Sequence, residues 1–109
     1  MSLPEVSPIV EFQVEALRVL VYENRAIMGR AAAGHVGRAI AERQAADGSP
    51  RANVIFAAAP SQDEFLAGLV AHPRIDWSRV AAFHMDEYLG LEADHPESFR
   101  RYLYEHLFR

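Results

Sequence analysis

Acidic side chains that could act as a proton-transfer base lie in the last third of the chain. Asp86 and Glu87 directly follow an apolar run, and His84 stands two residues before Asp86. Successive strand residues point to opposite faces, so Asp86 and Glu87 cannot address one substrate atom while the strand continues. If the strand ends at Met85, Asp86 leaves the sheet, and apolar neighbours would raise its pKa and make it a better base. The competing interpretation is that Asp86 caps a turn and Glu87 is a solvated surface charge.

A metal site at this position is not predicted. His84 and Asp86 have part of the spacing of a ligand pair, but no third ligand follows at a fitting distance. A strand histidine of this kind is more often a packing residue held by hydrogen bonds.

A second candidate site lies at Ser61 and Gln62, after another apolar run. Ser61 and Glu64 have the spacing of a capping box, which predicts that a helix begins here. Free amides at a helix N-terminus attract anions, so phosphate could bind beside Ser61 and Gln62. Asp63 and Glu64 argue against this, because they already place two negative charges in the first turn.

Alternating strands and helices would bring these two candidates together. The pattern predicts strands at 16–22, 52–59 and 80–84, a helix over 25–46 with Asn24 as N-cap, a helix after 61 and a helix from Pro96. Strand–helix alternation predicts an α/β fold with a parallel, Rossmann-like sheet in three layers. Ligands of such sheets bind beyond the carboxyl ends of the strands, where Ser61 and Asp86 both stand.

Several details of packing follow from the same pattern. The strand at 16–22 should be buried on at least one face, and the nearly continuous apolar strand at 52–59 should be central and covered on both faces. Gly29, Ala33 and Gly37 form a stripe of small residues that predicts close packing of the long helix on the sheet. Residues 1–9 should be an irregular lead-in.

The predicted sheet is incomplete. Three strands leave a long apolar edge unpaired, which folded proteins normally avoid. Residues 1–109 therefore read as one domain that is the N-terminal portion of a larger α/β domain, or that a partner chain completes. A homo-oligomer is compatible with either interpretation.

Composition excludes several kinds of chemistry. A formal charge of −4 and a pI near 5.7 argue against nucleic acid as the main partner. All 11 basic residues are arginine, which excludes a Schiff-base or P-loop lysine, and the absence of cysteine excludes thiolate chemistry. The sequence shows no signal peptide and no apolar run near the ~20 residues of a membrane span, so the cytoplasm is the default location and no membrane partner is expected.

The segment Phe83–Leu91, followed by His95-Pro96-Glu97-Ser98-Phe99, resembles the glucosamine-6-phosphate deaminase family, most clearly over residues 54–108. The resemblance implies a 6-phosphogluconolactonase-like fold and a small-molecule sugar phosphate as partner. It implies that Asp86 is the catalytic base that moves a proton between C1 and C2 of the open-chain sugar, and that ammonia is released without a metal or cofactor. Glu87 would orient the site, and Ser61, Gln62, His84 and Glu87 are the predicted substrate contacts.

Two departures from the family leave alternatives open. The family has a Thr-Gly-Gly-Thr-like phosphate loop where this chain has Ala58-Ala59-Pro60-Ser61-Gln62, and family members are much longer. The 109 residues alone are therefore expected to lack turnover. The alternatives are a 6-phosphogluconolactonase-like hydrolase, whose motif tends to have arginine where Tyr88 stands, and a non-catalytic sugar-phosphate-binding domain with an altered phosphate loop.

Overall fold

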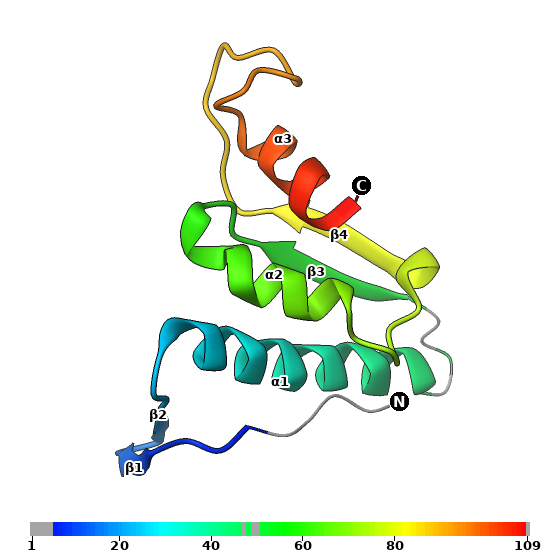
Figure 1. Cartoon of the computed structure of the whole chain (residues 1–109). Coiled ribbons are helices and arrows are strands. Elements are labelled where there is room, and N and C mark those ends of the chain that lie inside the picture. Colours follow the sequence, from blue (N-terminus) through cyan, green and yellow to red (C-terminus); the bar gives the residue numbers. More distant parts are fainter. Residues whose placement is uncertain (1–5, 47, 49–50, 109) are drawn as a thin grey trace.

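A computed structural model describes residues 6–46, 48 and 51–108 as a mixed α/β structure (Figure 1). Helices and short strands alternate along most of the chain. Short 3₁₀ turns at Pro60–Gln62 and Trp77–Arg79 and a π-helical turn at Tyr104–Phe108 join or extend them. The elements are β1 (Val10–Val14), β2 (Leu17–Val21), α1 (Arg25–Ala45), β3 (Ala52–Phe56), α2 (Asp63–Val70), β4 (Val80–His84) and α3 (Phe99–Leu103).

Helix α1 begins where the sequence predicts it. The side-chain oxygen of Asn24 accepts a hydrogen bond from the amide of Ile27 at 2.9 Å, which satisfies one of the free donors of the first turn. The helix ends at Ala45. Glycine and proline commonly follow a helix end, and the chain has Gly48 and Pro50 there. Gly48 has a positive φ of 70°, whereas Asp47, Ser49 and Pro50 lie outside the described residues.

The first predicted strand does not join the parallel sheet, so this prediction is wrong. β2 instead pairs with β1 in an antiparallel hairpin, with Val10 opposite Val21 and Val14 opposite Leu17. Glu15 allows the tight reversal because it adopts a left-handed φ of 53°. The hairpin is largely exposed, contrary to the buried strand that was expected. Residues 6–9 form no helix or strand, and residues 1–5 lie outside the described part.

Strands β3 and β4 form the predicted parallel pair. Ala52 lies opposite Val80 and Phe56 opposite His84, and the amide of Met85 donates to the carbonyl of Phe56 at 2.9 Å. β3 is shorter than predicted, since it ends at Phe56. Within the described residues this sheet has two strands, so the three-layer arrangement is not found.

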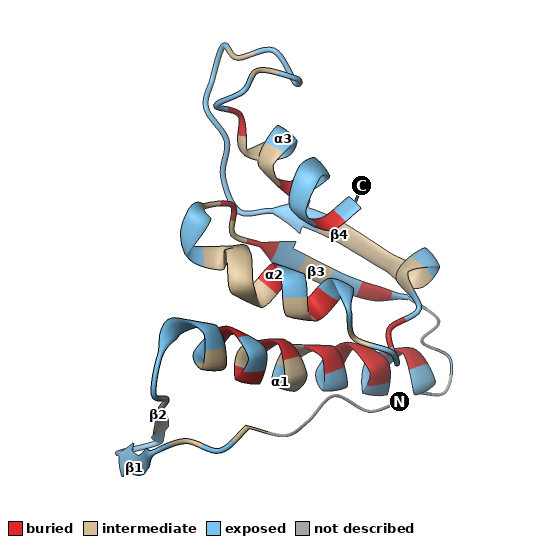
Figure 2. Cartoon of the chain, viewed as in Figure 1, coloured by how far each residue is buried: buried red, intermediate tan, exposed pale blue. Residues whose placement is uncertain are grey.

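One face of the β3–β4 sheet carries the core, and the other is open. Ala52 and Phe56 pack inward with buried side chains of all three helical segments: Ile40, Leu66, Leu69, Leu103 and Leu107. The neighbouring residues Ile55 and Phe83 point the other way and are 69% and 56% exposed. The expectation that β3 is covered on both faces is therefore wrong for this chain, as Figure 2 shows by the mixed burial along both strands.

The stripe of small residues on α1 packs closely, but against α2 and not against the sheet. A Cβ atom added at Gly29 would lie 2.6 Å from the Cβ of Glu64, and one at Gly68 would lie 2.8 Å from the Cβ of Ala33. A Cβ at Gly37 would overlap the ring of His72. The missing side chains therefore let the two helix backbones approach each other.

Helix α3 begins at Phe99, three residues later than predicted. The hydroxyl of Ser98 accepts from the amide of Arg101 at 3.1 Å and is the N-cap, so Pro96 lies in the preceding loop. Leu103 and Leu107 are buried, whereas His106 is exposed. No helix in the described ranges is both long enough and apolar enough to cross a membrane.

Candidate functional site

The two predicted site segments meet at one edge of the molecule. β3 and β4 run parallel and in register, so the turn at Pro60–Gln62 and the segment after His84 both leave the sheet at its carboxyl edge. Helices α1 and α2 also begin at this edge (Figure 1). The topology that the sequence predicted for the site is therefore present.

Asp86 and His84 are both exposed at the end of β4. Neither side chain forms a hydrogen bond or ion pair with another residue of the described part. The apolar desolvation expected around Asp86 is not found, because Met85 and Tyr88 are themselves 69% and 54% exposed. Asp86 is thus an exposed carboxylate whose oxygens accept no hydrogen bond from the described residues.

Glu87 binds the start of helix α3. Its Oε1 accepts from the amides of Tyr88 at 3.0 Å and Phe99 at 2.9 Å, and its Oε2 accepts from the amide of Arg100 at 2.9 Å. The backbone hydrogen bonds from Phe99 and Arg100 are the main causes that hold the pKa of Glu87 below its usual value. The two adjacent acids therefore differ in role, since Glu87 positions the loop while Asp86 stays free.

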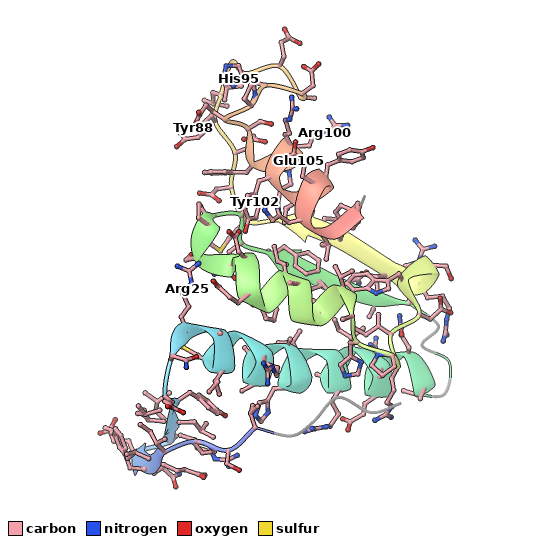
Figure 3. All side chains as sticks on the ribbon, in the orientation of Figure 1. Arg25, Tyr88, His95, Arg100, Tyr102 and Glu105 are labelled. Atoms are coloured by element: carbon pink, nitrogen blue, oxygen red, sulfur yellow. The ribbon has the colours of Figure 1, made fainter. Side chains whose placement is uncertain are left out.

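The loop between β4 and α3 is held by further contacts of its own. The rings of Tyr88 and Phe99 lie 4.9 Å apart between centroids, tilted by 38°. His95 Nδ1 accepts from the amide of Glu97 at 3.0 Å, and the Ser98 hydroxyl donates to the carbonyl of Ala93 at 3.1 Å. Figure 3 shows Tyr88 and His95 on this loop, beyond the helices. The motif residues after Glu87 thus shape the loop.

Replacing Glu87 with glutamine is expected to loosen the first turn of α3, because the neutral amide has one carbonyl oxygen in place of two charged acceptors. Hydrogen exchange of the Phe99 and Arg100 amides should become faster. Because the folded pKa of Glu87 is lowered, its contribution is present above the ordinary value of 4.5 and is lost as the pH falls through the folded value. The difference between wild type and variant should therefore shrink in acid.

The exposed Glu92 provides the control, because its side chain forms no hydrogen bond with the described residues. Glu92→Gln should leave exchange at Phe99 and Arg100 unchanged. Equal exchange in Glu87→Gln and wild type at neutral pH would contradict the role given to Glu87.

The capping box predicted at Ser61 is not formed. Gln62 precedes α2 without a side-chain cap, and Ser61 lies within the 3₁₀ turn. The carboxylate of Glu64 instead accepts from Nε of Arg25 at 2.6 Å. In the Arg25–Glu64 pair both groups are charged, and this bond holds the Glu64 carboxylate toward α1.

Arg25 is a further candidate residue at this edge, and no sequence pattern predicts its place there. Its guanidinium also donates to the carbonyl of Pro60, and it lies between the starts of α1 and α2 (Figure 3). A cavity of about 280 Å³ opens here, lined by Arg25, Ser61 and Gln62 among others. No local signal predicts this, because Arg25 and Glu64 are 39 positions apart.

Asp63 joins α2 to the last helical segment. The Tyr102 hydroxyl donates to Asp63 Oδ1 at 2.5 Å, and the His106 ring stacks on Tyr102 with centroids 4.1 Å apart. His106 Nε2 lies 3.6 Å from the same Asp63 oxygen. Burial first, and then the Asp63 carboxylate, raise the pKa of Tyr102. These contacts fix α3 beside the start of α2, at the same edge as Ser61.

Tyr102→Phe is expected to lower the free energy of unfolding by about 1 kcal/mol, because it removes the hydroxyl donor of Asp63. Since the folded pKa of Tyr102 is raised, this contribution is present below the ordinary value of 10.0 and is lost as the pH rises through the folded value. Urea denaturation of Tyr102→Phe and Tyr104→Phe measures it. Tyr104 is 59% exposed, and an equal effect of both changes would refute the role of the Tyr102 hydroxyl.

The described residues contain no group of three or more His, Asp or Glu side chains that could hold a metal ion. What the edge offers is a free carboxylate at Asp86, a loop positioned by Glu87, and a small cavity beside Arg25. Such an edge can bind a small polar molecule and transfer a proton on it.

Known proteins similar to this chain are glucosamine-6-phosphate deaminases. The one from Vibrio parahaemolyticus is 32% identical over 98 residues, which cover 84% of this chain and 35% of that protein. The one from Vibrio cholerae is 31% identical over 94 residues with the same coverage of 84% and 35%. Glucosamine-6-phosphate deaminase 2 of Bacillus subtilis is 49% identical over 35 residues, 32% of this chain and 14% of that protein.

A solved structure supports the fold. A crystal structure of a protein from Neisseria gonorrhoeae assigned as a 6-phosphogluconolactonase matches 81% of this chain and 36% of that chain, with a TM-score of 0.72 and 24% identity. No protein-family model matches the chain. These comparisons confirm the resemblance indicated by the motif at Phe83–Leu91, and the chain spans 35%, about a third, of the length of the first two relatives.

Proposed function

We propose that the chain, which resembles part of the glucosamine-6-phosphate deaminases, belongs to a sugar-phosphate isomerase/deaminase that converts an amino sugar phosphate to a ketose phosphate and ammonia. The observation that carries the proposal is the pair of acids after β4. Glu87 is bonded to three backbone amides, while Asp86 beside it is free at the carboxyl edge. The similarity of 84% of the chain to deaminases supports the same assignment.

The proposed reaction begins with proton transfer by Asp86. Asp86 takes the proton from C2 of the open-chain amino sugar, and a C1–C2 double bond forms as O1 takes a proton from solvent. Asp86 then returns its proton to C1, which leaves an iminium at C2. Water adds to the iminium, one proton goes back to solvent and ammonia leaves, so one water is consumed and a ketose remains. A positioned carboxylate suits both transfers because one group serves as base and then as acid.

The phosphate of the substrate is proposed to bind near Ser61 and Gln62. The cavity of about 280 Å³ beside Arg25 is small for a whole ligand, since such pockets usually measure roughly 300–1,000 Å³, but it admits a phosphate group. Glu64 already pairs with Arg25, and the turn at Pro60–Gln62 contains no glycine that would bring its backbone close to a phosphate. A phosphate there would rely on the Ser61 hydroxyl and the Gln62 amide. His84 is the proposed contact on the β4 side.

Activity is proposed for the whole protein that contains these residues. Because the chain spans 35% of a deaminase relative, the 109 residues alone are expected to lack turnover. Their place as the N-terminal portion of one domain, a homo-oligomeric state and a cytoplasmic location stay predictions.

Incubating the whole protein with glucosamine 6-phosphate tests the proposal. Ammonia and a ketose phosphate should appear in equal amounts. A parallel assay with 6-phosphogluconolactone tests the hydrolase, which would acidify the solution without ammonia. If glucosamine 6-phosphate binds and no ammonia appears, the enzyme assignment fails and a non-catalytic sugar-phosphate-binding domain replaces it.

A further inference from the structure

A second cavity lies away from the carboxyl edge. It measures about 730 Å³, is open to solvent, and is lined by the β1–β2 hairpin, the middle of α1, and the segment His72–Arg74 that follows α2. This segment lies at the opposite end of α2 from Ser61 and Gln62. The proposed reaction does not use this cavity.

Positive charge dominates the lining of this cavity. Arg18, Arg30, Arg38 and Arg74 all contribute to it, against a single acid, Glu11. Glu11 pairs with Arg18 at 2.6 Å. Arg30, Arg38 and Arg74 form no ion pair with any residue of the described ranges. Three arginines without an ion pair to the described residues therefore line one concave site, in a chain whose net charge is −4.

The lowered pKa of His72 indicates burial and a positive electrostatic potential at this cavity. Burial first, and then the charges of Arg74 and Arg38, lower its pKa. Two arginines from different elements thus raise the positive potential at the same ring. His72 Nδ1 accepts from the amide of Arg74 at 3.3 Å, and the ring packs over Gly37, so its position is held by both sides.

The hairpin presents its polar face to this cavity. Alternation along the paired strands places Glu11 and Arg18 on that face together with Leu20, and all three line the cavity. Gly34 of α1 also lines it, and a Cβ at this position would meet no heavy atom within 4 Å. The space above α1 is therefore open to a ligand.

We propose that this cavity binds a small phosphorylated anion between Arg30, Arg38 and Arg74. Guanidinium groups match phosphate oxygens with paired, charge-assisted hydrogen bonds. The volume of about 730 Å³ is that of a metabolite site. A nucleic acid would instead require a basic stripe along the surface. The proposal does not depend on the function of the strand-end site.

Calorimetric titration of the whole protein with pyrophosphate tests the site, with inorganic phosphate in a second arm. Pyrophosphate should bind saturably and more tightly than phosphate, because it can engage more of the guanidinium groups. The double change Arg30→Gln and Arg38→Gln should weaken pyrophosphate binding roughly tenfold or more. Arg43→Gln, at an exposed position of the same helix outside the cavity, should leave it unchanged.

A substitution that keeps all charges tests whether pyrophosphate binds in the cavity or elsewhere on the charged surface. Gly34→Leu should fill the open space and weaken pyrophosphate binding, while circular dichroism confirms that the helix content is kept. Asp86→Asn should leave pyrophosphate binding at this cavity unchanged. Absence of saturable binding, an equal loss in Arg43→Gln, or undiminished binding in Gly34→Leu would each overturn the proposal.

Discussion

Replacing Asp86 with asparagine is expected to lower the rate of ammonia release by the whole protein about 10²–10⁴-fold, the usual effect of removing a positioned general base. Asparagine has nearly the shape of aspartate but cannot accept a proton from C2. Because Asp86 makes no hydrogen bond within the described residues, the change should leave the fold intact. A coupled assay of ammonia with glucosamine 6-phosphate measures kcat, and the KM should change much less.

Asp94→Asn is the matched control for this change. Asp94 is an exposed acid of the same loop, and its backbone carbonyl, which accepts from Arg101 at 2.8 Å, is retained in the variant. Its activity should equal that of the wild type. If Asp86→Asn keeps full activity, or if both variants lose the same amount, Asp86 is not the base.

Gly29→Val is expected to lower the free energy of unfolding by about 3 kcal/mol, because overpacking of a close contact forces the backbone to move. The added Cβ would lie 2.6 Å from the Cβ of Glu64 and 3.0 Å from the backbone nitrogen of Phe65. Neither atom belongs to a flexible side-chain end, so α1 and α2 must separate. Urea denaturation followed by circular dichroism measures the loss.

Gly34→Ala is the control on the same helix. No heavy atom lies within 4 Å of a Cβ at Gly34, so the methyl group meets no obstacle. The change should raise the free energy of unfolding by about 0.5–1 kcal/mol, since alanine favours a helix over glycine. A Gly29→Val protein as stable as the wild type would show that the helices do not pack as closely as the structure indicates.

The contacts of Arg25 connect the stability of the fold to the shape of the proposed site. The guanidinium joins Glu64 and the Pro60 carbonyl, so it holds the turn that carries Ser61 against the start of α1. This arrangement explains how a turn without glycine keeps a defined shape at the carboxyl edge. The turn is held by a side chain from another element and not by a backbone loop of its own.

Much of the fold could be predicted from local patterns. Asn24 begins α1, and the apolar segments of β3 and β4 pair in parallel as the strand–helix alternation requires. The predictions are wrong where contacts between residues far apart in the sequence determine the local structure. The hairpin turn at Glu15 contains no glycine or asparagine, the residues that usually indicate such a turn, and Glu15 itself adopts a positive φ. α3 begins at Phe99 because Ser98 and Glu87 cap it, although Pro96 suggested an earlier start.

Local sequence patterns are enough to place the long helix, the parallel strands and the strand end that carries Asp86. Caps, prolines and apolar alternation act over a few neighbouring residues, so their effect can be inferred without the rest of the chain. The partners of the candidate site residues, in contrast, depend on the packing of whole elements. Arg25 meets Glu64 across 39 positions, and Glu87 meets Phe99 across 12. Such pairs depend on how whole elements pack against each other, which the spacing of residues within one element does not encode.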